Sequence, residues 1–312
     1  MKAAFINKYG KAENFEIGYL PDPKISTDEV LIKNAAFGIN PVDWKMRKGN
    51  LWFLLGFKFP KIPGVECAGV VIQIGKNVTE FKIGDEVMAI TGAEFGGHAQ
   101  LVAVDQNKVS LKPKNFSFEQ AGALSLAAIT ALQALQTLGN IKKGQKVLIN
   151  GASGGVGIFA VQIAKIFEAE VYATCSDKNI EFVKSLGADF VIDYKTKTLE
   201  YFNQKFDILF DTVGTLSFSK AKKVLTKNGI YVNTLPRPII LIQQFFSSIF
   251  GQKKAKTFLA KANKNDFEWL VKHCENNQIK VIFDSIFSID EIAKAHAKSE
   301  TERAVGKIVV KY

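Results

Sequence analysis

The segment Gln145-Lys-Val-Leu-Ile-Asn-Gly-Ala-Ser-Gly-Gly-Val-Gly-Ile-Phe-Ala-Val-Gln-Ile-Ala-Lys165 decides the fold of this chain. Its apolar run Val147–Ile149 predicts a buried parallel strand, and the apolar-periodic residues after the glycines predict a helix. The turn between them contains Ala152-x-Gly154-x-x-Gly157, the Gly-x-Gly-x-x-Gly fingerprint with alanine in first place. Gly154 would let a pyrophosphate approach the backbone, and Gly157 would let helix and strand pack closely. This context favours a dinucleotide-binding site over a tight turn that binds nothing.

The composition is that of an ordinary globular protein, with 47% hydrophobic and 23% charged residues. The 312 residues allow two domains of about 150 residues each. Cysteines and histidines are few and scattered singly, which favours small buried thiols over a disulfide framework or a histidine-based metal site. They are Cys67, Cys175, Cys274, His98, His273 and His296.

The start of the chain, Met1–Lys8, has no apolar core long enough for a signal peptide, and no run elsewhere approaches about 18 uncharged apolar residues. We therefore expect a cytoplasmic protein. The formal net charge of +11 permits binding to nucleic acid, to an anionic membrane or to an anionic cofactor. Because the lysines are spread along the chain without a basic block interleaved with aromatics, a solvated lysine-rich surface is the favoured interpretation.

Residues 1–118 are rich in Val, Ile and Phe and are interrupted often by Gly and Pro. This pattern predicts a β-rich, barrel-like domain of short strands separated by turns. The predicted strands are Phe15–Leu20, Glu29–Ala36, Ala68–Gly75 and Asp85–Ile90. From Phe118 to Leu135 the pattern changes to Ala- and Leu-rich helical periodicity, which predicts a domain boundary near residue 118.

Predicted strands and helices alternate regularly from residue 146 to residue 233. The strands are predicted at 146–150, 170–175, 190–193, 206–211 and 230–233, and the helices at 155–167, 179–186 and 219–225. This alternation predicts an α/β, doubly wound parallel sheet with a cofactor at the carboxyl ends of its strands. After a helix predicted at 266–276 the tail returns to strand character, so residues 1–118 with 280–312 are expected to form one domain and residues 119–279 the other.

The most apolar segment, residues 238–261, contains a cluster of lysines that follows its apolar run. It is compatible with a substrate-pocket wall, with a helix on an anionic membrane surface, and with a helix buried against the other domain or a dimer partner. The pocket wall and the buried helix are the favoured interpretations. Together with residues 50–60, this segment is expected to shape an apolar pocket for a hydrophobic substrate.

Several further motifs follow one another along nearly the whole chain. They are Asn40–Gly49, Phe59–Val71, Phe81–Val87, Gly96–Gln100, Leu124–Leu135, the glycine turn, Gly187–Asp189 and Gly306–Val310. In this order they resemble the zinc-independent quinone oxidoreductase branch of the medium-chain dehydrogenases/reductases. The resemblance implies a GroES-like catalytic domain built from both chain ends, a Rossmann domain and a homodimer.

Zinc enzymes of that superfamily carry a cysteine ligand where this chain has Asn40, and a Gly-His-Glu where it has Gly64-Val65-Glu66. Asn and Val supply neither thiolate nor imidazole, so a metal-free enzyme is expected. A site without a metal lacks a Lewis acid worth several kcal/mol, so its acceptor should already be activated by conjugation. Quinones and α,β-unsaturated aldehydes or ketones fit this requirement.

The choice of cofactor is a separate question. NAD sites place Asp or Glu at the end of the second strand to bind the ribose 2′-hydroxyl, and counting along the chain puts that place near Thr174. A neutral Thr leaves room for a 2′-phosphate, which Ser176 and Lys178 could bind, and this favours NADPH over NADH. Asp177 stands between them and would repel the phosphate if its carboxylate turned inward.

The resemblance also implies roles for individual residues. Asn40 would contact the nicotinamide or its ribose, and Thr130 would lie near the nicotinamide. Residues 154–156 would hold the pyrophosphate, Ser176, Lys178 and Tyr194 would hold the adenosine phosphate end, and Val213 and Leu235 would line the groove. The full set of cofactor-binding candidates is Asn40, Thr130, Ala152, Gly154, Gly155, Val156, Ser176, Lys178, Tyr194, Val213 and Leu235.

Some relatives carry a Tyr near the nicotinamide where this chain has Lys45. Lys45, or Trp44 beside it, is therefore a candidate for substrate contact, with Asn40 and Thr130 as the other catalytic candidates. The alternative for residues 43–45 is a structural helix start with Asp43 as N-cap and Trp44 in the core. For Thr130 the alternative is a helix-interior hydroxyl bonded to its own backbone.

The leading hypothesis is an NADPH-dependent, zinc-independent reductase of quinones or conjugated carbonyls. The second is a catalytically weak NADPH-binding redox sensor or regulatory protein that binds a partner, including nucleic acid. The third is a peripheral membrane reductase that docks through residues 238–256.

Overall fold

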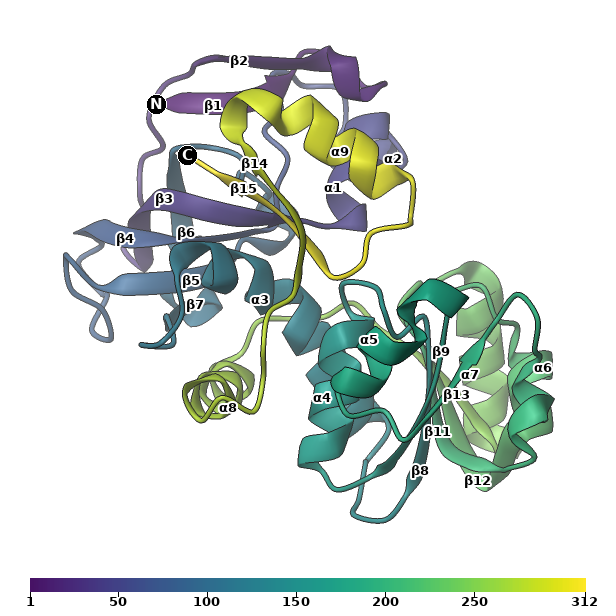
Figure 1. Ribbon diagram of the computed structural model, residues 1–312. Helices are drawn as coiled ribbons and strands as arrows, with labels where there is room; N and C mark the ends of the chain where they lie inside the picture. The colour runs from purple at the N-terminus through teal and green to yellow at the C-terminus, as the bar shows by residue number, and fades with distance from the viewer. The chain divides into compact units, whose positions relative to one another are not determined.

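The computed structural model describes residues 1–249 and 251–312, which form two compact units. The first unit comprises Met1–Leu126 and Lys261–Tyr312, and the second comprises Ala127–Ala260 (Figure 1). The limit between them falls inside helix α3 (Phe118–Leu132). The domain boundaries expected near residues 118 and 280 stay a prediction.

The first unit is built on a seven-stranded sheet with the order β14-β15-β3-β4-β5-β7, in which β6 also pairs with β3. A separate hairpin joins β1 and β2. The strands are β1 (Lys2–Ile6), β2 (Phe15–Tyr19), β3 (Glu29–Ile39), β4 (Glu66–Ile74), β5 (Glu86–Ile90), β6 (Leu101–Asp105), β7 (Val109–Leu111), β14 (Phe283–Ser288) and β15 (Lys307–Lys311). The helices are α1 (Pro41–Lys48), α2 (Trp52–Leu55), α8 (Lys264–Glu275) and α9 (Ile292–Glu300). Since β15 runs antiparallel to β3, the carboxyl-terminal tail joins the sheet of the amino-terminal part.

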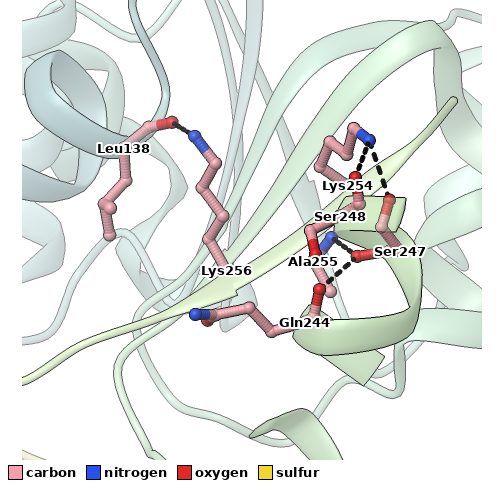
Figure 2. A pocket seen from close by; sticks show the side chains of 7 residues that line it. All are labelled: Leu138, Gln244, Ser247, Ser248, Lys254, Ala255 and Lys256. Atoms are coloured by element: carbon pink, nitrogen blue, oxygen red, sulfur yellow. Dashed lines mark hydrogen bonds between the residues drawn. The ribbon is translucent and has the colours of Figure 1, made fainter. Parts of the chain in front are cut away.

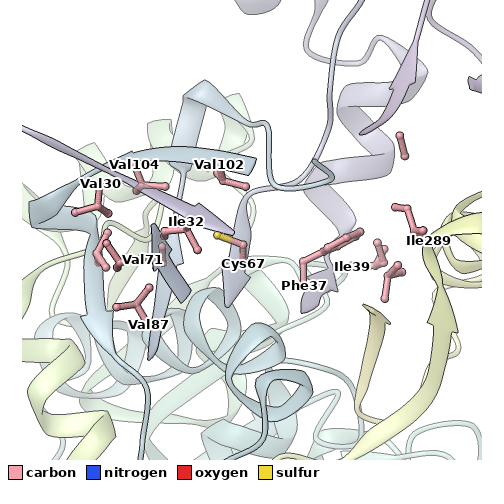
Figure 3. Packing of buried hydrophobic residues seen from close by; sticks show 14 of the residues in the cluster. Val30, Ile32, Phe37, Ile39, Cys67, Val71, Val87, Val102, Val104 and Ile289 are labelled. Carbon is pink, nitrogen blue, oxygen red and sulfur yellow. The ribbon is translucent and has the colours of Figure 1, made fainter. Parts of the chain in front are cut away.

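The core of this unit is a cluster of branched apolar side chains from both ends of the chain. Figure 3 shows Val30 and Ile32 of β3 near Val71 of β4, with Ile289 from the tail farther along the same cluster. Each such side chain contributes about 1.5–3 kcal/mol when fully buried. Cys67 lies in the cluster, and burial raises the pKa of its thiol to about 12. All three cysteines are buried and free, which confirms their predicted role as small apolar residues.

The second unit is a six-stranded parallel sheet with the order β10-β9-β8-β11-β12-β13. In chain order from β8 this arrangement is 3-2-1-4-5-6, which confirms the predicted doubly wound fold. The strands are β8 (Lys146–Asn150), β9 (Glu170–Cys175), β10 (Phe190–Asp193), β11 (Phe206–Asp211), β12 (Leu225–Asn233) and β13 (Lys254–Thr257). The helices are α4 (Gly157–Ile166), α5 (Ile180–Ser185), α6 (Phe218–Val224) and α7 (Pro238–Phe250). The topological switch point, where such folds bind their ligand, lies between β8 and β11.

Helix α3 continues into a π-helix at Gln133–Leu138. Together, Phe118–Leu138 spans 21 residues, and its most apolar 18-residue window has a mean hydropathy of 1.4, enough by length and composition alone to cross a membrane. It is not an unbroken apolar run of the kind that the sequence was expected to lack, because polar residues such as Gln133 interrupt it, and it reaches this length only by its mean hydropathy. Because 67% of its most apolar window is buried inside the protein, the helix is weak evidence for a membrane span and fits a core helix.

Helix α7 is largely exposed within this chain, so it is not buried against the rest of the chain, and burial against a dimer partner stays a prediction. Ile240 and Ser247 are its buried side chains among the described residues. The helix lines a pocket of about 250 Å³ together with β13 and Leu138, as Figure 2 shows. Lys256 donates to the carbonyl oxygen of Leu138 at 2.7 Å, and Lys254 donates to two carbonyl oxygens of the helix. The pocket lies along β13 and away from the glycine turn after β8.

Candidate functional site

The glycine turn lies directly after β8, at the switch point of the parallel sheet. A Cβ added at Gly157 would lie 2.2 Å from the carbonyl oxygen of Gly151, so this position must stay glycine for the helix to pack. At Gly154 an added Cβ would meet only the oxygen of Gly151, at 3.5 Å. There is therefore free space beside the backbone at Gly154 and none at Gly157. This is the arrangement that a pyrophosphate requires, so the turn fits a dinucleotide.

A buried carboxylate that sequence analysis missed holds the strand ends around this turn. Asp211, at the end of β11, accepts a hydrogen bond from Asn150 Nδ2 at 2.8 Å, and Asn150 ends β8. The same carboxylate accepts from the backbone N–H groups of Gly214 at 3.0 Å and Leu216 at 2.9 Å. Tyr231 of β12 donates to it as well. The available sequence signal was a polar residue, Asn150, Asp211 or Asn233, at the last position of each of these strands.

Thr174 does not occupy the place that sequence counting gave it. Its side chain is fully buried, its Oγ1 donates to Asn150 Oδ1 at 2.7 Å, and the N–H of Gly151 donates to that Oγ1 at 3.3 Å. Thr174 therefore supports the glycine turn from inside, and it cannot be the residue beside a ribose. The last residue of β9 is Cys175, as predicted for this strand, so Thr174 lies one residue before the strand end.

Ser176 is the residue that follows the end of β9, and a second missed residue ties it to the turn. Asn179 is buried, and its Nδ2 donates to Ser153 Oγ at 3.2 Å and to Ser176 Oγ at 3.1 Å. Lys178 is exposed, as is Asp177. Tyr194 follows β10 with 58% of its side chain exposed, and its N–H donates to the oxygen of Cys175 at 3.1 Å. The three predicted adenosine-phosphate residues thus lie along one edge of the sheet.

The other predicted groove residues lie on the opposite side of the turn. A Cβ at Gly151 would lie 2.4 Å from Val213 Cγ2, and a Cβ at Gly214 would lie 2.6 Å from Leu235 Cδ1. Val213 and Leu235 are therefore in direct contact with the loops that leave β8 and β11. Thr130 also belongs to this second unit, half-buried on α3.

In the first unit, Asn40 belongs to a buried polar cluster. Lys307 Nζ donates to Asn40 Oδ1 at 2.7 Å and to Glu66 Oε1 at 3.1 Å. Asn40 Nδ2 donates to Glu66 Oε1 at 2.8 Å, while the other oxygen of Glu66 accepts from the N–H of Leu126 at 2.7 Å. All three side chains are buried. Lys307 can only donate, so its contact with Oδ1 defines which way the amide of Asn40 faces.

Helix α1 starts one residue after Asn40, and this revises the predicted cap. Asn40 is the N-cap, and Asp43 lies at the third helical position, where its Oδ2 accepts from the N–H of Asn40 at 2.7 Å. Burial raises the pKa of Asp43 to about 8, and Glu66 nearby adds to the shift. Trp44 is buried, whereas Lys45 is half-buried with its ammonium 5.3 Å from the centroid of that indole.

The cluster around Asn40 does not fit a zinc ion. Glu66 supplies the only carboxylate of the trio, and both Asn40 and Glu66 already face the ammonium of Lys307. A second cation would be repelled by that ammonium, and a tetrahedral site needs thiolate, imidazole or carboxylate ligands that Asn40 and Val65 cannot provide. Within residues 1–249 and 251–312, no group of three or more His, Cys, Asp or Glu side chains is placed to hold a metal.

Comparisons with known proteins agree with this architecture. Residues 26–114 match the alcohol dehydrogenase GroES-like domain, and residues 186–310 match a family described as zinc-binding dehydrogenase. A chloroplast envelope quinone oxidoreductase homolog from Arabidopsis thaliana is 37% identical over 99% of this chain and 98% of its own. An NADPH-dependent alkenal/one oxidoreductase of the same plant, named as chloroplastic, is 33% identical over 99% of this chain and 79% of its own.

Among solved structures, the quinone oxidoreductase from Coxiella burnetii superposes with a TM-score of 0.93 and 29% identity, over 100% of this chain and 99% of its own. Both plant relatives are named as chloroplast proteins, which contradicts the expectation of a cytoplasmic protein. The identity to the envelope homolog extends across both units, so the likeness is not confined to one domain. The chain belongs to the quinone oxidoreductase branch of the medium-chain dehydrogenases/reductases and is an oxidoreductase.

Proposed function

We propose that this protein is an NADPH-dependent oxidoreductase that transfers hydride, without zinc, to a quinone or an α,β-unsaturated aldehyde or ketone. The observation that carries the proposal is the glycine turn, open at Gly154 and held by the buried carboxylate of Asp211. The names of the relatives, a quinone oxidoreductase homolog and an NADPH-dependent alkenal/one oxidoreductase, support the same class of reaction.

The second unit supplies the residues that would hold the cofactor. The backbone at Gly154, Gly155 and Val156 would bind the pyrophosphate, with the start of α4 facing its negative charge. Lys178 is exposed beside Ser176 and would bind the 2′-phosphate as a point charge. Ser176 has no carboxylate that would bind a 2′-hydroxyl in its place, so NADPH is preferred over NADH.

The first unit supplies the residue that would orient the nicotinamide. Asn40 uses one N–H on Glu66, and its Oδ1 accepts from Lys307 and takes part in the capping box of α1, so one N–H of its amide remains. This N–H can donate to the carboxamide or ribose of the cofactor. The bound cofactor would itself supply the hydride, and the protein would mainly align the reactants and exclude water.

The acceptor follows from the chemistry of the cluster. The Asn40 cluster suits no Lewis acid, so the charge that arrives with hydride must be delocalised by the acceptor itself. Lys45, half-buried on α1, remains the candidate for contact with the substrate. The alternative of a catalytically weak redox sensor is unsupported, because the names of the relatives denote oxidoreductases. A homodimer also stays a prediction, which light scattering after size-exclusion chromatography would test.

The test follows NADPH absorbance with purified protein, a metal chelator and four acceptors: a simple quinone, an enal, an enone and an unactivated ketone. We expect turnover of at least one activated acceptor, no turnover of the ketone, and faster oxidation of NADPH than of NADH. Binding of NADPH without turnover of any activated acceptor would overturn the proposed reaction. Activity that disappears with chelator and returns with zinc would overturn the metal-free part.

A further inference from the structure

The buried polar cluster around Asn40 contains a second carboxyl group. Asp43 lies on α1, three residues after Asn40, and its side chain is fully buried. Its Oδ2 accepts a hydrogen bond from the N–H of Asn40 at 2.7 Å. Its Oδ1 is also buried and finds no hydrogen-bond partner within residues 1–249 and 251–312. The reaction proposed above leaves this carboxyl group without a role.

The net charge of the cluster depends on whether Asp43 holds a proton. Lys307 Nζ donates to Glu66 Oε1 at 3.1 Å, so one ammonium faces one carboxylate. Both side chains are buried, and water therefore screens their charges weakly. With a protonated Asp43, the three groups together are neutral. With an ionised Asp43, they carry one net negative charge.

The surroundings of Asp43 favour its protonated form at neutral pH. Burial raises the pKa of Asp43 to about 8, and the carboxylate of Glu66 adds to the shift. The N–H of Asn40 and the ammonium of Lys307 act in the opposite direction without cancelling it. The proton on Asp43 therefore exchanges in a range of pH in which enzymes work.

The titratable groups of the helix that packs against α1 keep one charge state in that range. On α9, Glu300 forms ion pairs with Arg47 and Lys48, at the other end of α1. His296 of α9 and the neighbouring His98 are fully buried, and burial lowers the pKa of both rings. Both rings are therefore neutral around pH 8.

The nicotinamide that Asn40 is proposed to contact differs in charge between the two states of the cofactor. The ring of NADPH is neutral, whereas the ring of NADP⁺ carries a positive charge. A negative charge near this ring stabilises the oxidised cofactor relative to the reduced one. The ratio of the two affinities reports on the nicotinamide end alone, because the phosphates are the same in both cofactors.

We propose that the proton on Asp43 selects the redox state of the bound cofactor. While Asp43 holds its proton, the neutral cluster favours NADPH and lets NADP⁺ leave after the reaction. Once Asp43 is ionised, the cluster retains NADP⁺. Asp43 acts by its charge, without touching the cofactor, so it is not a catalytic residue. The inference rests on the proposed function, since it requires Asn40 to lie beside the nicotinamide.

The experiment titrates the purified full chain with NADPH and with NADP⁺ between about pH 6.5 and pH 9. As the pH rises, the affinity for NADP⁺ should increase relative to that for NADPH by roughly tenfold, because Asp43 ionises. Calorimetric titration in buffers of different ionisation enthalpy counts the protons exchanged. Binding of NADP⁺ should release about half a proton more than binding of NADPH near pH 7.5.

Three variants assign the effect to Asp43. Asp43→Asn can still accept from the N–H of Asn40 but has no proton to lose, so its ratio of affinities should not change with pH. Lys45→Met tests the neighbouring ammonium of α1, whose deprotonation would also favour NADP⁺, and it should keep the pH dependence. The matched control Asp290→Asn removes an exposed carboxyl of the first unit that is bonded to Lys2, and it should also keep the dependence. Thermal unfolding of each variant establishes that it is folded.

The outcomes separate this inference from the proposed function. A chain that binds neither cofactor overturns both. A chain that binds NADPH and NADP⁺ with a ratio independent of pH overturns only the role of Asp43. That role is also overturned if Asp43→Asn keeps the pH dependence or if Lys45→Met abolishes it. Should Asp43→Asn fail to fold, Glu66→Gln gives the same test, since removing this carboxylate should move the transition to lower pH. An unmoved transition in Glu66→Gln would then overturn the role.

Discussion

The ammonium of Lys307 lies 2.7 Å from Oδ1 of Asn40, although the two residues are 267 positions apart in the chain. The contact exists because β15 pairs with β3, so the last strand of the chain places its first residue beside the end of β3. Glu66 of β4 completes the trio. The residue proposed to orient the nicotinamide is thus held by both ends of the chain.

The first prediction concerns the energy of this trio. Lys307→Met leaves the carboxylate of Glu66 buried without its cation, so we expect a loss of about 3–5 kcal/mol in the free energy of unfolding. Adding Glu66→Gln should restore much of it, because the buried charge is then removed with its partner. Urea unfolding of the two variants measures the difference. The matched control is Lys143→Met, whose partner Glu168 is exposed, and it should not change stability measurably. Equal losses in both lysine variants would contradict the prediction.

The second prediction separates the two glycines of the turn. Gly157→Ala forces a Cβ to 2.2 Å from the oxygen of Gly151, so we expect a lower melting temperature. Gly154→Ala meets no close atom of the protein and should melt normally, but its methyl group would obstruct the pyrophosphate and lower NADPH affinity by about tenfold or more. Differential scanning fluorimetry and NADPH titration measure the two effects. Normal NADPH binding by Gly154→Ala would show that the turn does not hold the cofactor as proposed.

The third prediction is a dependence of stability on pH. His98 is fully buried against Phe37 and His296, and burial lowers its pKa from the ordinary value of 6.5 to about 3. The folded state therefore keeps the ring neutral, while the unfolded state takes up a proton below pH 6.5. The contribution of His98 to stability should be full above pH 6.5 and should fall by about 1.4 kcal/mol for each pH unit below it, and His296, whose pKa burial also lowers, adds to the same dependence.

The measurement for His98 is urea unfolding between pH 7 and pH 5, above the range in which exposed carboxyl groups titrate. His98→Leu lacks this ring, keeps His296 and should reduce the slope. The control His273→Gln changes a half-buried histidine at the surface and should keep it. A slope that is unchanged in His98→Leu would assign the pH dependence to other groups.

The fourth prediction concerns cofactor preference. Lys178→Met removes the proposed partner of the 2′-phosphate and should weaken NADPH binding by about tenfold, with little effect on NADH. Asp177→Asn should strengthen NADPH binding, because the neighbouring negative charge is removed. Fluorescence titration with both cofactors measures the two ratios, and Lys184→Met on α5 serves as the control for loss of an exposed charge. A parallel loss of NADPH and NADH affinity in Lys178→Met would mean that this lysine does not select between them.

The regular elements of the second unit were largely predictable from sequence, because each depends on local periodicity. The runs Glu170–Cys175 and Phe206–Asp211 are mostly apolar and were assigned as strands with the observed limits. The strand β13, Lys254–Thr257, was missed because two of its four residues are lysines. It is a strand only because β12 offers it a parallel edge.

The sequence by itself determined the fold class, the place of the dinucleotide turn and the family, since these depend on the spacing of glycines and apolar residues along the chain. Tertiary structure alone decided that Thr174 points inward to Asn150, that Asp211 joins the strand ends and that Lys307 holds Asn40. It also decided that most of the large apolar side chains of α7 are exposed. The physical reason is that hydrogen-bond partners and burial depend on which strands become neighbours, and residues distant in sequence supply them.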